Sequence, residues 1–106
     1  MDAKTRARCE ARARILKSLA HPTRLFIVEE LARGERCVCE LQEMIGADMS
    51  TVSKHLAQLK SAGVVADDKR GVQVFYTLRA GCVPGFLDCI QTILRENVER
   101  ELKCVR

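Results

Sequence analysis

The 106-residue sequence predicts a mainly helical fold with one β-hairpin, a winged helix-turn-helix that dimerises through its N- and C-terminal helices. Three observations predict this fold. Two short amphipathic segments are separated only by residues 46–48, a pair of strand-like segments follows directly, and a long helical pattern lies at each end of the chain. The length fits one domain, residues 1–106.

The first two predicted helices meet at His21 and Pro22. Residues 4–20 repeat small and apolar side chains at three- and four-residue spacing, which predicts a helix that ends before the proline. Pro22 suits the first position of the second helix, and Gly34 is a typical helix stop.

The next two predicted helices form the helix-turn-helix. The first runs from about Val38 to Ile45 and is closed by Gly46. Asp48 is placed to cap the second, which ends near Gly63. Two short helices joined by a tight, glycine-containing turn are the signature of this motif.

A β-hairpin, or wing, is predicted after Gly63. Residues 64–68 and 72–78 read as strands, and the second alternates apolar and polar side chains. Residues 68–71 form the predicted turn, which places Lys69 and Arg70 at the tip.

The last predicted helix runs from Pro84 to about Cys104. Its apolar stripe consists of Leu87, Ile90, Leu94, Val98, Leu102 and Val105. Together with the first helix it offers more apolar surface than so thin a domain covers, which favours a symmetric homodimer; packing of the two helices on each other within one chain is the alternative.

Composition limits the classes of partner. The formal net charge of +4 (18 basic and 14 acidic residues) is compatible with nucleic-acid binding. No apolar run approaches the ~20 residues of a membrane span, and the N-terminus lacks the apolar stretch of a secretory signal. We therefore expect a cytoplasmic protein without a membrane partner.

On the predicted second helix of the helix-turn-helix, mostly small polar side chains occupy the face opposite the apolar stripe. Such groups can hydrogen-bond base edges or phosphates in the major groove of a palindromic, double-stranded operator, read by a dimer. Wing-tip cations would reach phosphates or the minor groove. The predicted DNA-binding residues are Ser50, Thr51, Ser53, Lys54, His55, Gln58, Lys69 and Arg70.

Cys37 and Cys39 lie at the start of the helix-turn-helix. Inside one regular helix, side chains two positions apart point about 200° away from each other. The two thiols can share a ligand only if Cys37 lies at or before the helix start in extended backbone. There, free N–H groups and the helix dipole stabilise thiolates. Two small buried hydrophobic residues are the alternative interpretation.

Thiolates select soft ions. A zinc site wants four ligands, often including His, whereas As(III) or Sb(III) needs three thiolates, so we expect As(III) or Sb(III) and no organic cofactor. The third thiolate is expected to be Cys9 or Cys104, either of which the partner chain could supply. The roles of Cys82 and Cys89 stay open, although packing suits Cys89.

Four segments resemble the ArsR/SmtB family of metal-sensing winged-helix repressors: residues 19–25, 37–41, 50–56 and 59–65. The resemblance implies a homodimeric repressor that leaves DNA when an ion binds, and not an enzyme. The Cys37-Val-Cys39 element is similar to that of arsenic- and antimony-responsive members, and it also occurs in cadmium and lead sensors. Gln42 stands where the best-known arsenic sensors have their third cysteine.

Three rival interpretations remain. A thiol-redox or persulfide sensor on the same fold is the nearest. A thiol-exchange enzyme would carry Cys-x-x-Cys in a βαβ context, which this sequence lacks. A metal carrier that does not bind DNA is the third.

Overall fold

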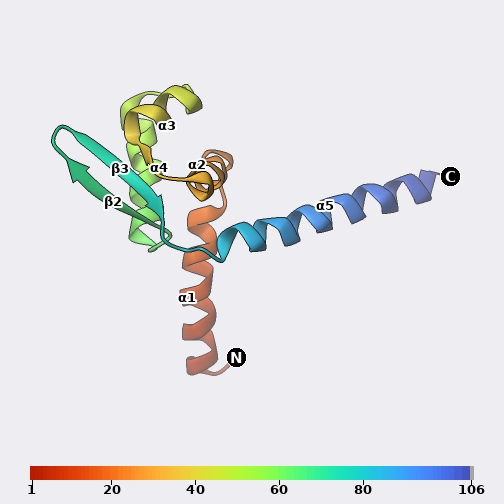
Figure 1. The fold of residues 1–106 in the computed structure, drawn as a ribbon. Helices are drawn as coiled ribbons and strands as arrows, with labels where there is room; N and C mark the ends of the chain where they lie inside the picture. The colour runs from red at the N-terminus through yellow and green to blue at the C-terminus, as the bar shows by residue number, and fades with distance from the viewer. Residues whose placement is uncertain (106) are drawn as a thin grey trace.

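The computed structural model describes residues 1–105, which form five helices and a three-stranded sheet (Figure 1). In chain order these are α1 (Ala3–Leu19), α2 (Pro22–Arg33), β1 (Arg36–Cys37), α3 (Val38–Ile45), α4 (Met49–Ser61), β2 (Val65–Arg70), β3 (Gln73–Leu78) and α5 (Val83–Val105).

The helix-turn-helix is confirmed. Gly46 ends α3 in the left-handed conformation with a φ of 77°, which a residue without Cβ adopts at low cost. Asp48 then caps α4. The inner faces of both helices supply Leu41, Val52 and Leu56 to the core, each at most 1% exposed. These apolar contacts hold α3 and α4 in one fixed relative orientation.

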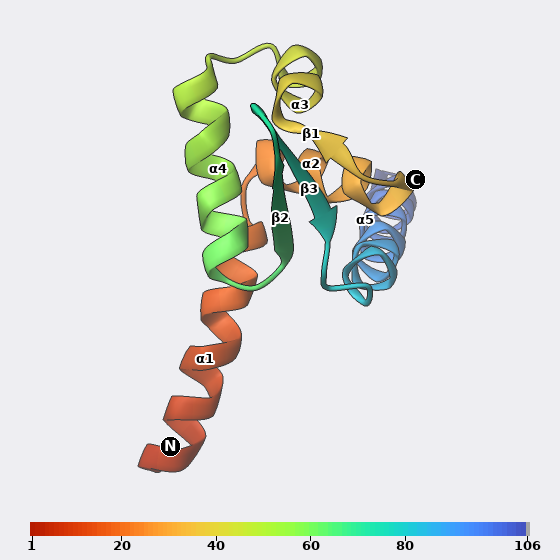
Figure 2. The same ribbon diagram turned by 60° about the vertical axis from the view of Figure 1, so that its left-hand side comes forward.

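The sheet has the order β1-β3-β2, and both pairings are antiparallel (Figure 2). Because β2 and β3 pair as far as Arg70 opposite Gln73, the wing loop is Gly71-Val72, two residues long. Gly71 has a φ of 62°, as the first position of a tight hairpin loop requires. The predicted turn at residues 68–71 was therefore wrong, and both Lys69 and Arg70 lie in β2.

The two-residue strand β1 was not expected. Arg36 and Cys37 pair with Tyr76 and Phe75 of β3. The pairing fixes the backbone just before α3 in an extended conformation, and so ties the start of the helix-turn-helix to the wing.

The terminal helices α1 and α5 project in different directions from the winged-helix body (Figures 1 and 2). The helix α5 begins one residue earlier than predicted, and no helix of the described chain is long and apolar enough to cross a membrane. Both helices leave large apolar side chains exposed, as the prediction of a dimer requires; the side chain of Val105 lies outside the described residues. The exposed residues are Ile15, Leu16, Phe86, Ile90, Ile93, Leu94, Val98 and Leu102.

Candidate functional site

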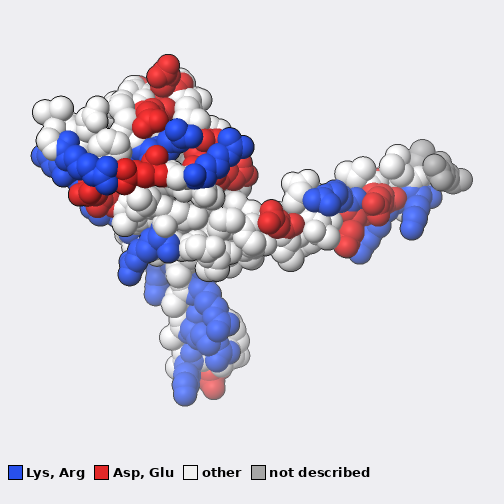
Figure 3. Space-filling view, viewed as in Figure 1, with Lys and Arg blue, Asp and Glu red and all other residues white. Residues whose placement is uncertain are grey.

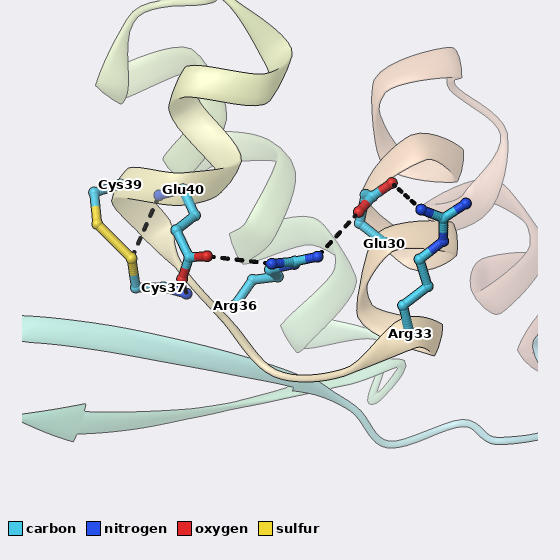
Figure 4. Close-up of polar contacts among 6 residues, drawn as sticks. All are labelled: Glu30, Arg33, Arg36, Cys37, Cys39 and Glu40. Carbon is cyan, nitrogen blue, oxygen red and sulfur yellow. Dashed lines mark hydrogen bonds and ion pairs between the residues drawn. A yellow bond between two sulfur atoms is a disulfide. The ribbon is translucent and has the colours of Figure 1, made fainter.

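The thiols of Cys37 and Cys39 meet at the N-terminus of α3. Cys37 is the N-cap residue in extended backbone (φ −79°, ψ 159°), and Cys39 is the second residue of the helix. Their Cα atoms are 5.4 Å apart, and the two sulfurs are joined as a disulfide (Figure 4). The expected geometry, with Cys37 before the helix start, is confirmed.

The Cys37 sulfur also caps the helix. The main-chain N–H of Glu40 donates to Cys37 Sγ over 3.4 Å, and the main-chain N–H of Cys37 donates to Glu40 Oε1 over 3.1 Å. The second bond lowers the pKa of Glu40. This is a capping box in which sulfur, a weak acceptor, stands in the place of the usual hydroxyl. The spacing Cys37-x-x-Glu40 was the sequence signal for it, which sequence reasoning missed.

Arg36 connects this helix start to α2 (Figure 4). One guanidinium nitrogen lies 3.3 Å from Glu40 Oε2, and another lies 3.7 Å from Glu30 Oε2. The Glu30 side chain is only 10% exposed, and Arg33 is a second, weaker ion-pair partner at 3.9 Å. The first turn of α3 is thus tied electrostatically to a buried carboxylate of α2. Sequence reasoning missed Glu30 and Arg36 in this role.

A hollow adjoins the two thiols. A cavity of about 440 Å³ lies between the start of α3, the helix α4 and the wing. Cys37, Cys39, Met49, Ser53, Val74 and Tyr76 are among the residues that line it. Cys37 is buried and Cys39 is exposed, so a small ligand can approach the pair from this side.

Among the residues that the structure describes, no third thiol lies beside the pair. The residues that the structure describes contain no group of three His, Cys, Asp or Glu side chains placed to hold a metal ion. Cys9 lies on α1 and Cys104 on α5, both exposed, and these helices project away from the winged-helix body (Figure 1). Cys82 and Cys89 are exposed as well.

The outer face of α4 carries the predicted polar residues. The inward face is closed by Val52, Leu56 and Leu59. Ser50, Thr51, Ser53, Lys54 and Gln58 are exposed on the other side. The Asp48 carboxylate accepts from the Thr51 main-chain N–H (3.2 Å) and the Ser50 hydroxyl (2.9 Å), so the first turn of α4 is capped. Which of these residues contact DNA stays a prediction.

His55 differs from its neighbours on α4 because it is half-buried. Its Nδ1 lies 3.2 Å from a guanidinium nitrogen of Arg24, and its ring packs on that of His21 with the centroids 4.4 Å apart. The predicted DNA contact of His55 stays untested.

The two predicted wing cations differ in their surroundings. Arg70 forms two 2.7 Å hydrogen bonds with Glu35 and a third, of 2.9 Å, with Asp68. These bonds raise its pKa further above the usual range. Among the described residues Lys69 forms no ion pair within 4.0 Å. Acidic and basic side chains alternate over this part of the surface, whereas basic side chains dominate α1 (Figure 3). A DNA contact by Arg70 would have to compete with Glu35.

A helix-turn-helix, a wing and two terminal helices with exposed apolar side chains are features of dimeric winged-helix DNA-binding proteins. Residues 21–67 match the model of the bacterial regulatory protein, arsR family. The chain is 36% identical to the biofilm growth-associated repressor of Xylella fastidiosa over 81 residues. The aligned region covers 76% of this chain and 71% of the relative. It belongs to the ArsR family and is a transcriptional repressor, not an enzyme.

A second sequence relative and a solved structure are also similar to this chain. The arsenic resistance transcriptional regulator ArsR1 of Pseudomonas putida is 39% identical over 72% of this chain and 59% of its own. The homodimeric winged helix-turn-helix DNA-binding domain of Mb0332 from Mycobacterium bovis superposes with a TM-score of 0.78 at 30% identity, over 94% of this chain and 93% of that domain. The predicted dimeric, DNA-binding assembly is thereby confirmed at the level of the family.

Proposed function

We propose that this repressor leaves its operator when a thiophilic ion, As(III) or Sb(III), binds the thiolates of Cys37 and Cys39. The observation that carries the proposal is the meeting of the two sulfurs at the N-terminus of α3. Thiolates are the preferred ligands of soft ions, and the helix N-terminus favours their negative charge. The ion requires the reduced pair, so a cellular thiol reductant must first open the disulfide.

The third thiolate of a pyramidal site is proposed to come from Cys9 or Cys104 of a second copy of the chain. Both lie on helices whose apolar faces are exposed in the single chain. A dimer that covers these faces would place Cys9 and Cys104 on its interface helices, from which the partner would supply the third thiolate. Zinc is disfavoured because it usually takes four ligands, whereas three thiolates suffice for As(III) or Sb(III).

The operator is proposed to be palindromic duplex DNA, read by α4 of each protomer. Ser50, Thr51, Ser53, Lys54 and Gln58 would face the major groove, while Lys69 and Arg70 would reach the backbone or the minor groove. His55 is not included among these contacts, because its ring faces Arg24 and His21.

Ion binding would act through the helix start. Binding of the ion would pull Cys37 Sγ away from its position 3.4 Å from the Glu40 main-chain N, so this hydrogen bond of the α3 capping box would lengthen. Because α3 packs against α4 and β3, a shift of α3 changes the position of the recognition helix. Coupling free energies of this kind are typically ~1–3 kcal/mol, or about 5- to 150-fold in operator affinity.

The test is an arsenite titration of the reduced repressor on fluorescent operator DNA, followed by anisotropy. The wild-type chain is expected to dissociate, whereas the double variant Cys37→Ser, Cys39→Ser stays bound. Cys82→Ser, Cys89→Ser is the matched control and is expected to dissociate like the wild type. Arsenite-induced release that survives the loss of both Cys37 and Cys39 contradicts the proposal.

A thiol-redox sensor is the second candidate, favoured by the disulfide between Cys37 and Cys39. In this mechanism a peroxide or polysulfide would oxidise the two thiols to the disulfide, and operator affinity would differ between the reduced and the disulfide-bonded repressor. Mass spectrometry of the reduced repressor after peroxide or polysulfide treatment tests it. A two-hydrogen mass loss or an added sulfur on the peptide that contains the pair, together with operator release, supports the redox function over ion binding.

A further inference from the structure

A cluster of three cationic or titratable side chains lies where α1, α2 and α4 meet, outside the thiol site. It consists of His21, Arg24 and His55. His21 precedes α2, Arg24 lies in its first turn, and His55 lies on the recognition helix. All three are half-buried.

Arg24 joins α1 to the recognition helix. Its Nε donates to the main-chain carbonyl of Ser18 over 2.6 Å, and another of its nitrogens lies 3.4 Å from the carbonyl of Lys17. Both carbonyls belong to the last turn of α1, where the helix dipole favours a cation. The remaining guanidinium nitrogen points to Nδ1 of His55. One side chain thus connects the C-terminus of α1 to the middle of α4.

The geometry requires both imidazoles to be neutral. A guanidinium can only donate, so the facing Nδ1 of His55 must accept and carries no proton. His21 Nδ1 accepts from the main-chain N–H of Thr23 over 3.0 Å and is likewise unprotonated. A proton on His55 Nδ1 would meet the Arg24 cation directly, with the His21 ring centroid 4.4 Å from that of His55 and tilted by 41° to it.

We propose that Arg24 and His55 form a proton-sensitive strut that positions the recognition helix, so that operator affinity falls when His55 is protonated. Arg24 and His55 act here as positioning residues. Protonation breaks the contact and frees α4 from the end of α1, a helix whose exposed Ile15 and Leu16 belong to the proposed dimer interface. Only the neutral form binds the operator tightly, so apparent affinity scales with its population.

The proposal fixes the direction of the pH dependence. Burial, His21 and Arg24 together lower the pKa of His55 from 6.5, so the strut is intact above pH 6.5 and is lost as the pH falls through the lowered value. Below that value operator affinity is expected to fall by as much as about tenfold per pH unit, the limit for one linked proton. A His55 that contacts a phosphate would give the opposite sign, since its charge would strengthen binding.

The experiment measures operator affinity by anisotropy from pH 7.5 to 5.0 for the reduced, ion-free wild type and for His55→Gln. Glutamine offers Arg24 an oxygen acceptor but does not titrate in this range. The wild type is expected to lose affinity on acidification, whereas His55→Gln is expected to be flat within about twofold. Circular dichroism at each pH establishes that both chains are folded.

Three outcomes overturn the proposal: affinity that is constant or rises in acid for the wild type, an equal loss in His55→Gln, or a loss that follows unfolding. If His55→Gln does not fold, ¹⁵N NMR of the wild-type imidazoles decides. The neutral tautomer with the proton on Nε2 of His55 supports the strut, and a proton on Nδ1 at pH 7.5 contradicts it. Because no ion is added, failure here leaves the proposed ion response intact.

Discussion

The two helices of the helix-turn-helix begin in different ways. The helix α4 starts at Asp48, whose carboxylate accepts two hydrogen bonds and stands exposed to solvent. The helix α3 starts at Cys37, whose buried sulfur accepts a single bond of 3.4 Å. Carboxylates and hydroxyls are the preferred N-caps, and a thiol is a poor substitute.

The difference between the two N-caps indicates that Cys37 does more at the start of α3 than stabilise the helix. Its weak sulfur bond is supplemented by the Glu40 carboxylate and by Arg36, which reaches the buried Glu30 of α2. The α4 cap has no such long-range connection among the described hydrogen bonds and ion pairs. A ligand on Cys37 would therefore perturb a helix start that is coupled to its surroundings, while α4 would keep its local cap at Asp48.

The largest expected effect on the free energy of unfolding comes from Arg36→Leu. This change removes the cation closest to the Glu30 carboxylate and leaves, among the described ion pairs, only Arg33, which lies on the same helix as Glu30. Because the Arg36 side chain is 33% exposed, we expect a loss of about 2 kcal/mol, below the ~3–5 kcal/mol of a fully buried pair. Urea denaturation measures it. Arg33→Leu is the matched control, since its side chain is 76% exposed, and should cost much less. Equal losses for the two variants would contradict the proposed link to α3.

The double variant Glu30→Gln, Arg36→Leu sharpens this result. Removing the buried charge as well is expected to recover much of the loss, because the penalty arises from the unpaired carboxylate. No recovery would mean that Arg36 acts through packing instead.

The two caps themselves give a smaller effect. Asp48→Ala removes the oxygen acceptor and is expected to lower the thermal midpoint by a few degrees. Cys37→Ser replaces a weak acceptor with a good one and is expected to change the midpoint little, although it removes the response to arsenite. Thermal denaturation compares them. A Cys37→Ser variant as unstable as Asp48→Ala would show that the sulfur is needed for the fold.

The smallest effect is the acid response of the α4 cap. The side chains of Thr51 and Ser50 and the Thr51 N–H hold the pKa of Asp48 below its ordinary 3.8. A lowered folded pKa means that the cap contributes fully above pH 3.8 and is lost as the pH falls through the lowered value. Carboxyl NMR titration should give this low pKa, and Asp48→Asn should remove the corresponding part of acid destabilisation. An ordinary pKa would contradict the cap.

Much of this arrangement follows from sequence pattern. The apolar spacing of Leu41, Val52 and Leu56 and the Gly46 stop are local signals, so the helix-turn-helix was predictable. The position of Cys37 ahead of α3 followed from helix geometry alone.

What escaped prediction depends on non-local pairing. The strand β1 is two residues long and exists because β3 pairs with it, and the wing loop moved to Gly71-Val72 through the register of β2 with β3. The contacts of Arg24 with His55 and of Arg70 with Glu35 join residues 31 and 35 positions apart. No local periodicity encodes such contacts.

Residue-resolved hydrogen exchange of the reduced repressor, with and without arsenite, tests the central claim that Cys37 transmits ligand binding to the start of α3. The main-chain amide of Glu40, which Cys37 Sγ holds, is expected to exchange faster when arsenite is bound. The amide of Thr51, which Asp48 holds, is expected to change much less. An unchanged Glu40 amide under saturating arsenite, or an equal change at both caps, would contradict the account.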